Sequence, residues 1–208
     1  QLGNTPTNIG DLRVAAWLDD DFCPIDNEVL QHLETVVHEL EKDGVPVDRT
    51  ARPDIDPDEA AMLGLWLVQR ATSQSSEGDG PGHRIWLDRH VRREQIRLKW
   101  AEFFNSYDAV IMPVCFVPPF EHQQEGDFMS RTLLCNEEQR SYLDVVKWTT
   151  MVGMAYLPST VPPTGLGESG LPIGCQVVGS YGSDRTTIAV ASHIGKLMGG
   201  YQPPPRAQ

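Results

Sequence analysis

The sequence predicts an α/β protein in which a β-sheet is layered between helices. Short apolar runs, typical of buried strands, alternate along the chain with longer segments whose apolar residues recur at the helical period. No internal repeat interrupts this alternation. The 208 residues are enough to build one substantial core, so we expect residues 1–208 to form a single domain.

A strand, a helix and a second strand are expected at the N-terminus. Residues 12–18 are an apolar run closed by three aspartates, which predicts a buried strand. An amphipathic helix follows, with Asp26 at its N-cap and Gly44 at the left-handed position after its end. Residues 45–47 begin an extended return. Because Pro46 has no amide hydrogen to donate, we expect this strand at a sheet edge.

Two helices are predicted in the middle of the chain. The first begins at the Asp56-Pro57 pair and continues to about Thr72, and its expected inward side chains are Met62, Leu65, Trp66 and Val68. The second covers residues 85–105 and carries many charges on a solvated face. Its expected inward side chains are Leu87, Val91, Ile96, Trp100 and Phe103 or Phe104. The Ser- and Gly-rich residues 73–82 predict a mobile loop between these helices.

Four further elements and a tail complete the expected fold. Residues 107–113 form an apolar run stopped by proline, which predicts a buried strand. We expect a helix over residues 137–152, a strand over residues 173–178 and a last helix over residues 184–198. Residues 199–208, with three consecutive prolines, predict an extended tail.

Composition excludes several classes of function. A net charge of −12 argues against a nucleic-acid partner and against an anionic membrane surface, which both require basic residues. No apolar run approaches the length of a membrane span. The four cysteines contain no Cys-x-x-Cys pair, so we expect neither a zinc site nor redox chemistry but buried, reduced thiols in a cytoplasmic protein.

The usual catalytic constellations are missing from the sequence. It contains no Gly-x-Ser-x-Gly, no His-Glu-x-x-His and no glycine-rich phosphate loop. We therefore predict no catalytic residue, no metal ligand and no cofactor within these residues. The four lysines are each interpreted as surface charge rather than as a general base: Lys42, Lys99, Lys147 and Lys196.

Three passages resemble the amidase signature hydrolases and occur in that family's order. Residues 12–47 are a weak match, and Tyr107 to Pro113 resembles the family's strand of an aspartate, aliphatic residues and proline. The strongest match is residues 155–179, which include Gly-Leu-Pro-Ile-Gly-Cys-Gln-Val-Val-Gly. The resemblance implies the C-terminal part of the amidase signature fold, with a mixed β-sheet flanked by helices.

The resemblance also implies a reaction whose chemical groups lie elsewhere. Family members cleave carboxamides with a Ser–cis-Ser–Lys triad in a Gly/Ser-rich region of their N-terminal half, and this sequence contains no such region. We therefore expect a chain that is inactive alone. It would supply scaffold and pocket walls for a small-molecule amide substrate bound together with the missing half.

Three residues are candidate substrate-binding positions on this resemblance. Cys115 and Phe116 follow the strand that ends at Pro113 and are expected in the pocket wall. Asp184 lies where some relatives place an acid toward the substrate, and it is equally a candidate N-cap of the last helix. Tyr156 stands where the family usually has glycine, so we expect the backbone packing there to differ.

Two alternatives remain open from the sequence. The chain could be a stand-alone binding or regulatory module that has lost the chemistry, or one chain of a split amidase whose partner supplies the triad. A partial sheet exposes an unpaired edge and an apolar face. All three hypotheses therefore predict a homodimer or a partner chain.

Overall fold

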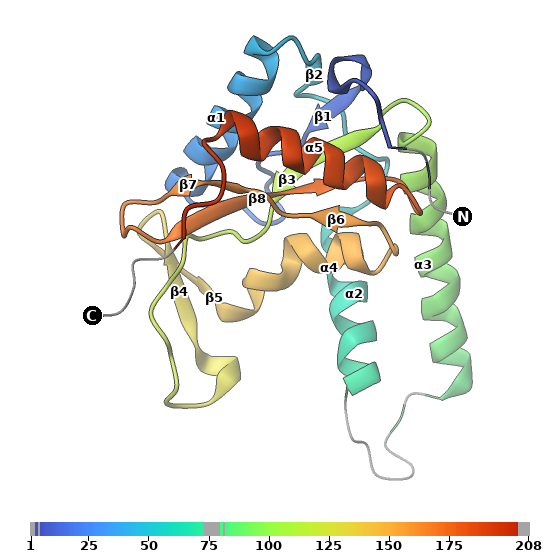
Figure 1. Cartoon of the computed structure of the whole chain (residues 1–208). Coiled ribbons are helices and arrows are strands. Elements are labelled where there is room, and N and C mark those ends of the chain that lie inside the picture. The colour runs from blue at the N-terminus through green and yellow to red at the C-terminus, as the bar shows by residue number, and fades with distance from the viewer. Residues whose placement is uncertain (1–2, 4, 73–79, 81, 204–208) are drawn as a thin grey trace.

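A computed structural model describes residues 3, 5–72, 80 and 82–203. Within them, six strands form one mixed sheet in the order β2-β1-β3-β8-β6, with β7 also paired to β8 (Figure 1). The strands are β1 (Val14–Ala16), β2 (Val47–Asp48), β3 (Ala109–Pro113), β6 (Ser159–Thr160), β7 (Pro163–Leu166) and β8 (Pro172–Val178). Helices flank this sheet, which confirms the predicted α/β fold class.

Strand β8 joins the two parts of the sheet. Strand β1 is parallel to both neighbours, β2 and β3, whereas β8 runs antiparallel to β3 with Met112 opposite Gln176. Strands β6 and β7 pair with the other side of β8, also antiparallel. Strand β2 begins directly after Pro46 and lies at the edge, which confirms the expected edge position.

Helices lie on both faces of the sheet (Figure 1). Helices α1 and α5 contact each other and β8 on one face, and the remaining three helices lie on the other. There Trp17, just after β1, has its ring centroid 6.5 Å from Trp100 of α3 and 5.6 Å from Trp148 of α4. The helices are α1 (Asn27–Lys42), α2 (Pro57–Thr72), α3 (His83–Phe103), α4 (Lys147–Gly153) and α5 (Asp184–Leu197).

The ends of α1 follow the predicted capping. Asp26 is the N-cap, and its carboxylate accepts from the amide of Glu28 at 2.9 Å. Gly44 after the helix has a φ of +88°, a left-handed conformation that costs glycine little. Both predictions are confirmed.

The predicted inward face of α2 is wrong for two of its residues. Met62 and Val68 are 50% and 53% exposed. The helix instead buries a face of small residues against α4, because small side chains allow two helix backbones to approach closely. The buried residues of α2 are Ala60, Ala61, Leu63 and Gly64.

The predicted inward face of α3 is correct only in its C-terminal half. Ile96, Trp100 and Phe103 are buried, but Leu87 and Val91 are 48% and 57% exposed. The reason is topological: the N-terminal turns of α3 extend past the sheet (Figure 1), and they meet α2 through other side chains, such as Trp86 beside Trp66.

The helix predicted over residues 137–152 is wrong in its first half. A β-hairpin occupies it, formed by β4 (Thr132–Cys135) and β5 (Glu138–Ser141), and a short 3-10 helix leads from there into α4. Asn136 and Glu137 form the tight turn with φ of +48° and +70°. The Asn136 side chain secures this turn by donating to the carbonyl of Ile25 at 3.0 Å.

Two predicted segments fall largely outside the described residues. Of the loop predicted over residues 73–82, residues 73–79 and 81 lie outside them, as do residues 204–208 of the expected tail. The described part of the tail, residues 199–203, contains neither helix nor strand. No helix among the described residues has the length and apolar character needed to cross a bilayer.

Candidate functional site

A small apolar cavity of about 240 Å³ opens where the chain leaves β3. The segment that follows Pro113 forms one wall and the first residues of β8 form another, with contributions from α1 and from the end of β6. Its lining includes Cys115, Val117, Phe120, Val29, Val161 and Ile173. A hollow with this lining accepts an apolar group rather than a charged one.

Cys115 lies in this cavity wall, where the sequence predicted a pocket residue. Its side chain is partly exposed, and burial raises the pKa of the thiol above its ordinary value. A raised pKa keeps the sulfur protonated at neutral pH, and the thiol is a far weaker nucleophile than the thiolate. The geometry therefore suits Cys115 to contact a ligand but not to act as a nucleophile.

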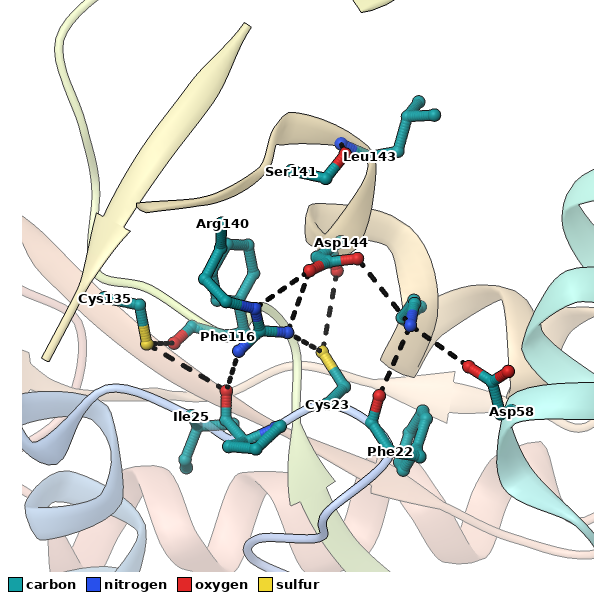
Figure 2. Close-up of polar contacts among 12 residues, drawn as sticks. Phe22, Cys23, Ile25, Asp58, Phe116, Cys135, Arg140, Ser141, Leu143 and Asp144 are labelled. Atoms are coloured by element: carbon teal, nitrogen blue, oxygen red, sulfur yellow. Dashed lines mark hydrogen bonds and ion pairs between the residues drawn. The ribbon is translucent and has the colours of Figure 1, made fainter. Parts of the chain in front are cut away.

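Phe116 does not line the cavity. Its side chain is fully buried, and the guanidinium of Arg140 lies over its ring at 4.9 Å (Figure 2). Its carbonyl accepts from the amide of Asp26 at 2.7 Å. Phe116 thus fixes the segment that contains Cys115 against the start of α1. Phe116 can affect ligand binding only by positioning this cavity wall.

Asp184 is the first residue of α5, at the other end of β8 from the cavity. The N-cap position belongs to Ser183, so the interpretation of Asp184 as the cap is wrong by one residue. A carboxylate in the first turn is still favourable, because the amide end of a helix carries positive potential. The structure does not bring Asp184 together with Cys115.

A polar cluster lies beside Phe116, the residue that follows Cys115 (Figure 2). Arg140 of β5 donates to the Asp144 carboxylate at 2.8 Å and 3.0 Å, and to the carbonyl of Pro24 at 3.0 Å. A further nitrogen contact joins Arg140 to the sulfur of Cys23 at 3.7 Å. The cluster fastens the hairpin to the loop that connects β1 with α1.

Lys147 belongs to the same cluster, which corrects its interpretation as surface charge. Its side chain is 21% exposed, and its ammonium lies 3.1 Å from Asp58 of α2 and 3.7 Å from Asp144. It also donates to the carbonyl of Phe22 at 3.3 Å. These partners give Lys147 a structural role: it joins the start of α4 to α2 and to the loop after β1.

The sequence patterns did not predict that Arg140 and Asp144 form a largely buried ion pair between a strand and a 3-10 helix. Their i, i+4 spacing and opposite charge were visible, and they matched the helix expected over residues 137–152. In the structure the pair spans the end of a strand and a 3-10 helix, with side chains 16% and 13% exposed.

The nucleophile–base pair that hydrolysis requires is not found among the described residues. No serine, threonine or cysteine side chain there hydrogen-bonds to a lysine or histidine side chain. Burial also raises the pKa of the Cys23 thiol to about 11 and that of Cys175 to about 12, the opposite of activation. The Ser75-Ser76 pair of the sequence lies outside the described residues.

Gly174 of the last sequence motif allows the chain after β6 to approach β8 closely. A Cβ at Gly174 would lie 2.9 Å from Val161 and 3.1 Å from the carbonyl of Pro162, so only glycine admits this neighbour. Tyr156 has a φ of +59°, a conformation that glycine adopts without strain. A preference for glycine at this position is therefore explained by backbone conformation.

Comparison with known proteins identifies the family. The chain has the architecture of an α/β hydrolytic enzyme of the amidase type, and a sequence model of the family described as Amidase matches residues 69–188. This match covers more than half of the chain, and the chain belongs to the amidase family.

Curated relatives match a shorter part of the chain. In Chlamydia abortus, the A subunit of glutamyl-tRNA(Gln) amidotransferase is 32% identical over 98 residues, which is 47% of this chain and 18% of that protein. The corresponding protein of Chlamydia trachomatis serovar D is 38% identical over 87 residues, 42% of this chain and 16% of that protein. The match thus spans under a fifth of the length of these curated relatives.

Solved structures match nearly the whole chain. Fatty acid amide hydrolase aligns with a TM-score of 0.67 and 15% identity over 96% of this chain and 42% of that one. In Thermotoga maritima, the A subunit of glutamyl-tRNA(Gln) amidotransferase matches with a TM-score of 0.64 and 20% identity, over 90% and 43%. At these identities the likeness concerns the fold, and the chain spans less than half of each solved chain.

Proposed function

We propose that this chain is the C-terminal part of an amidase that hydrolyses carboxamides through a Ser–cis-Ser–Lys triad located upstream of residue 1. In this proposal the chain supplies scaffold and walls of the substrate pocket and is inactive by itself. The amidase family match supports the reaction class.

One observation supports the proposal that this chain supplies the pocket walls and that other residues supply the triad. Solved relatives of the amidase fold align over 89 to 96% of this chain but only 42 to 47% of their own lengths. More than half of such a fold is therefore contributed by other residues. The lack of a serine–lysine pair among the described residues agrees with a triad outside them.

The cavity beside Cys115 is the best candidate for a pocket wall. Its volume of about 240 Å³ is below the usual range for a whole ligand, which agrees with a pocket completed by other residues. Its apolar lining favours the hydrocarbon part of a small amide. In this proposal Cys115 contacts the substrate, Phe116 acts on substrate binding only by positioning the wall, and Asp184 is a candidate substrate-binding residue at a separate place.

One observation favours a natural stand-alone or split form. The chain buries a continuous core of its own, built from both faces of the sheet, as a chain that exists by itself requires. A module that binds a ligand or joins a triad-bearing partner is therefore the second candidate function.

The experiment is an activity and labelling test on the purified chain. The chain is offered short aliphatic, aromatic and anilide amides, with ammonia or aniline release as the readout, and is treated with a fluorophosphonate that labels activated serines. We expect no turnover and no labelled serine. Serine-dependent turnover by these 208 residues would overturn the proposal.

The size of the polypeptide in its source cells separates the two candidates. An immunoblot under denaturing conditions that gives a band near twice 23.2 kDa would support the C-terminal part of a longer amidase. A band at 23.2 kDa would favour the stand-alone or split form.

A further inference from the structure

A second and larger hollow lies between helices α2, α3 and α4, away from Cys115. Its volume is about 410 Å³ and its lining is mostly apolar. The residues that shape it include Val68, Trp86, His90, Arg93, Met154 and Tyr156. We call this hollow the α2–α3–α4 groove.

Aromatic and cationic side chains stack along the groove. The Trp86 ring lies 4.2 Å from that of His90, and the guanidinium groups of Arg93 and Arg97 lie over Tyr156 at 4.5 Å and 5.0 Å. Tyr156 holds its position there despite a left-handed backbone conformation, which is a small local strain. The groove is thus apolar in its walls and positive along one side.

The positive charge of Arg93 is poorly neutralised among the described residues. Its side chain is only 15% exposed, and the carboxylate nearest to it in an ion pair is that of Glu94 at 3.6 Å. The other oxygen of Glu94 already contacts Arg97 at 2.5 Å. A largely covered guanidinium usually has a closely bonded carboxylate, and the described residues supply none to this one.

Several buried nitrogens at α2 and α3 also lack hydrogen-bond acceptors among the described residues. They are Arg70 Nε of α2 and His90 Nε2, Arg93 Nε and Trp100 Nε1 of α3, and a fifth such nitrogen, Arg131 Nε, lies outside these helices. Buried polar atoms in a finished protein interior are nearly always paired. Of these residues, His90 and Arg93 line the groove, so the groove itself holds two buried nitrogens that atoms from elsewhere could pair.

A second surface on α3 adjoins the groove. Leu87, Val91 and Leu98 are 48%, 57% and 70% exposed. At about 100° per residue they fall within roughly 40° of one another, so they form one apolar stripe, which the exposed Glu94 interrupts between Val91 and Leu98. No apolar side chain among residues 83–95, the first turns of α3, is buried.

We infer that the α2–α3–α4 groove and the apolar stripe of α3 form the face that docks the remainder of the amidase fold, through a segment that combines apolar anchors with carboxylates. This inference rests on the proposed function, and it names the surface and the chemistry of the contact. The apolar walls take the anchors, and Arg93 and Arg97 receive the acidic side chains.

The charge of α3 favours the remainder of the amidase fold, rather than a second copy of the chain, as the occupant of this face. Helix α3 contains six arginines and lysines against three acidic residues, on a chain whose net charge is −12. Two copies that met through α3 would place like charges together, which is unfavourable. A segment rich in carboxylates is complementary to this helix.

The test measures the accessibility of the stripe. Val91→Cys and the control Ile188→Cys are introduced at two positions that are each 57% exposed, one on α3 and one on α5. Each substitution is made in two samples. One is the isolated 208-residue chain, and the other is the polypeptide as its source cells produce it, purified together with any further residues or bound partner. The rate of reaction with a bulky maleimide is read peptide by peptide by mass spectrometry, so the native thiols do not interfere.

We expect Val91→Cys to react about tenfold more slowly in the source polypeptide than in the 208-residue chain, because interface cores exclude solvent. Ile188→Cys should react equally in both. Equal rates for Val91→Cys in a source polypeptide with amidase activity would overturn this inference and leave the proposed function intact. Protection without serine-dependent turnover would overturn the proposed function and, with it, the named occupant.

Two further comparisons complete the test. Protection of Val91→Cys that grows with concentration in the 208-residue chain alone would mean that a second copy covers the stripe, which would also overturn the inference. Charge reversal by Arg93→Glu with Arg97→Glu should remove the protection, whereas Arg185→Glu on α5 should not. Protection that survives reversal at α3 would refute the role of these arginines.

Discussion

Gly64 of α2 lies so close to Thr150 of α4 that a Cβ at Gly64 would stand 2.6 Å from the Thr150 carbonyl oxygen. The Thr150 hydroxyl also donates to the carbonyl of Ala61 at 3.3 Å. The two helices therefore meet backbone to backbone, and their contact sets the floor from which the α2–α3–α4 groove opens.

Substitution Gly64→Ala should destabilise the protein. The added methyl group must push the two helices apart, because the atom that it meets is backbone and cannot rotate away. We expect a loss of about 1–3 kcal/mol in the free energy of unfolding, measured by urea denaturation.

Gly195→Ala is the matched control. Gly195 lies inside α5, and a Cβ there would meet nothing within 4 Å. Alanine favours a helix over glycine by about 1 kcal/mol, so this variant should be slightly more stable than the parent. If both variants lost stability equally, the close approach of α2 and α4 would be disproved.

Thiol labelling should distinguish Cys115 from the other three cysteines. Cys23, Cys135 and Cys175 are buried, and only Cys115 among the four is partly exposed. We expect Ellman's reagent to modify one thiol per folded chain and all four after denaturation. Because burial raises the pKa of the Cys115 thiol, its reaction should be slower than that of a small-molecule thiol at about pH 8 and should accelerate as pH rises.

The assignment of the reactive thiol follows from Cys115→Ser. The folded variant should lose the one modification seen in the folded parent and keep three thiols that react only when it unfolds. Modification of the folded variant would mean that a buried cysteine becomes accessible in solution.

The hydrogen bond between Tyr107 and Asp48 should make the free energy of unfolding depend on pH in the acidic range. The Tyr107 hydroxyl donates to the Asp48 carboxylate at 2.5 Å, and this bond, with bonds from Thr50, holds the pKa of Asp48 below its ordinary value. A depressed pKa means that the stabilisation is complete above about pH 4 and is lost as pH falls below that value. Tyr107→Phe should therefore be less stable than the parent at about pH 7, and the difference should shrink toward about pH 2. A difference that stays constant with pH would contradict the proposed bond.

Sequence patterns predicted the elements whose own residues determine them. Helix α1 follows from its apolar stripe, its cap at Asp26 and its terminal Gly44, and β3 and β8 follow from apolar runs bounded by proline and glycine. The hairpin of β4 and β5 did not follow, because its turn at Asn136 is held by contacts with Ile25 and Asp26, far away in the sequence. Local patterning cannot register such contacts.

The exposed faces of α2 and α3 escaped prediction for a different reason. Met62, Val68, Leu87 and Val91 are apolar, and an inward position is the natural expectation for such residues in a complete fold. The described residues contain no layer to cover them. The docking face inferred for α3 rests on the same observation, that apolar side chains of this helix are exposed.

Loss of the ion pair of Arg140 and Asp144 should destabilise the protein more than loss of an exposed ion pair. Both side chains are largely buried, and Arg140 additionally satisfies the carbonyl of Pro24 and covers the Phe116 ring. Arg140→Ala would leave the Asp144 carboxylate partly buried with Lys147 at 3.7 Å as its remaining ion-pair partner. We expect a loss of about 3 kcal/mol in the free energy of unfolding, near the lower end for a broken buried pair because both side chains keep some solvent contact.

Lys42→Ala provides the comparison for a surface pair. Lys42 is 68% exposed and contacts Glu39 at 3.2 Å within α1, so its loss should cost less than about 1 kcal/mol. Amide hydrogen exchange should further localise the effect of Arg140→Ala to the hairpin and to the loop before α1, which Arg140 joins. Equal costs for the two variants, or exchange unchanged in the hairpin, would refute the assignment of Arg140 as the contact that fastens the cavity wall.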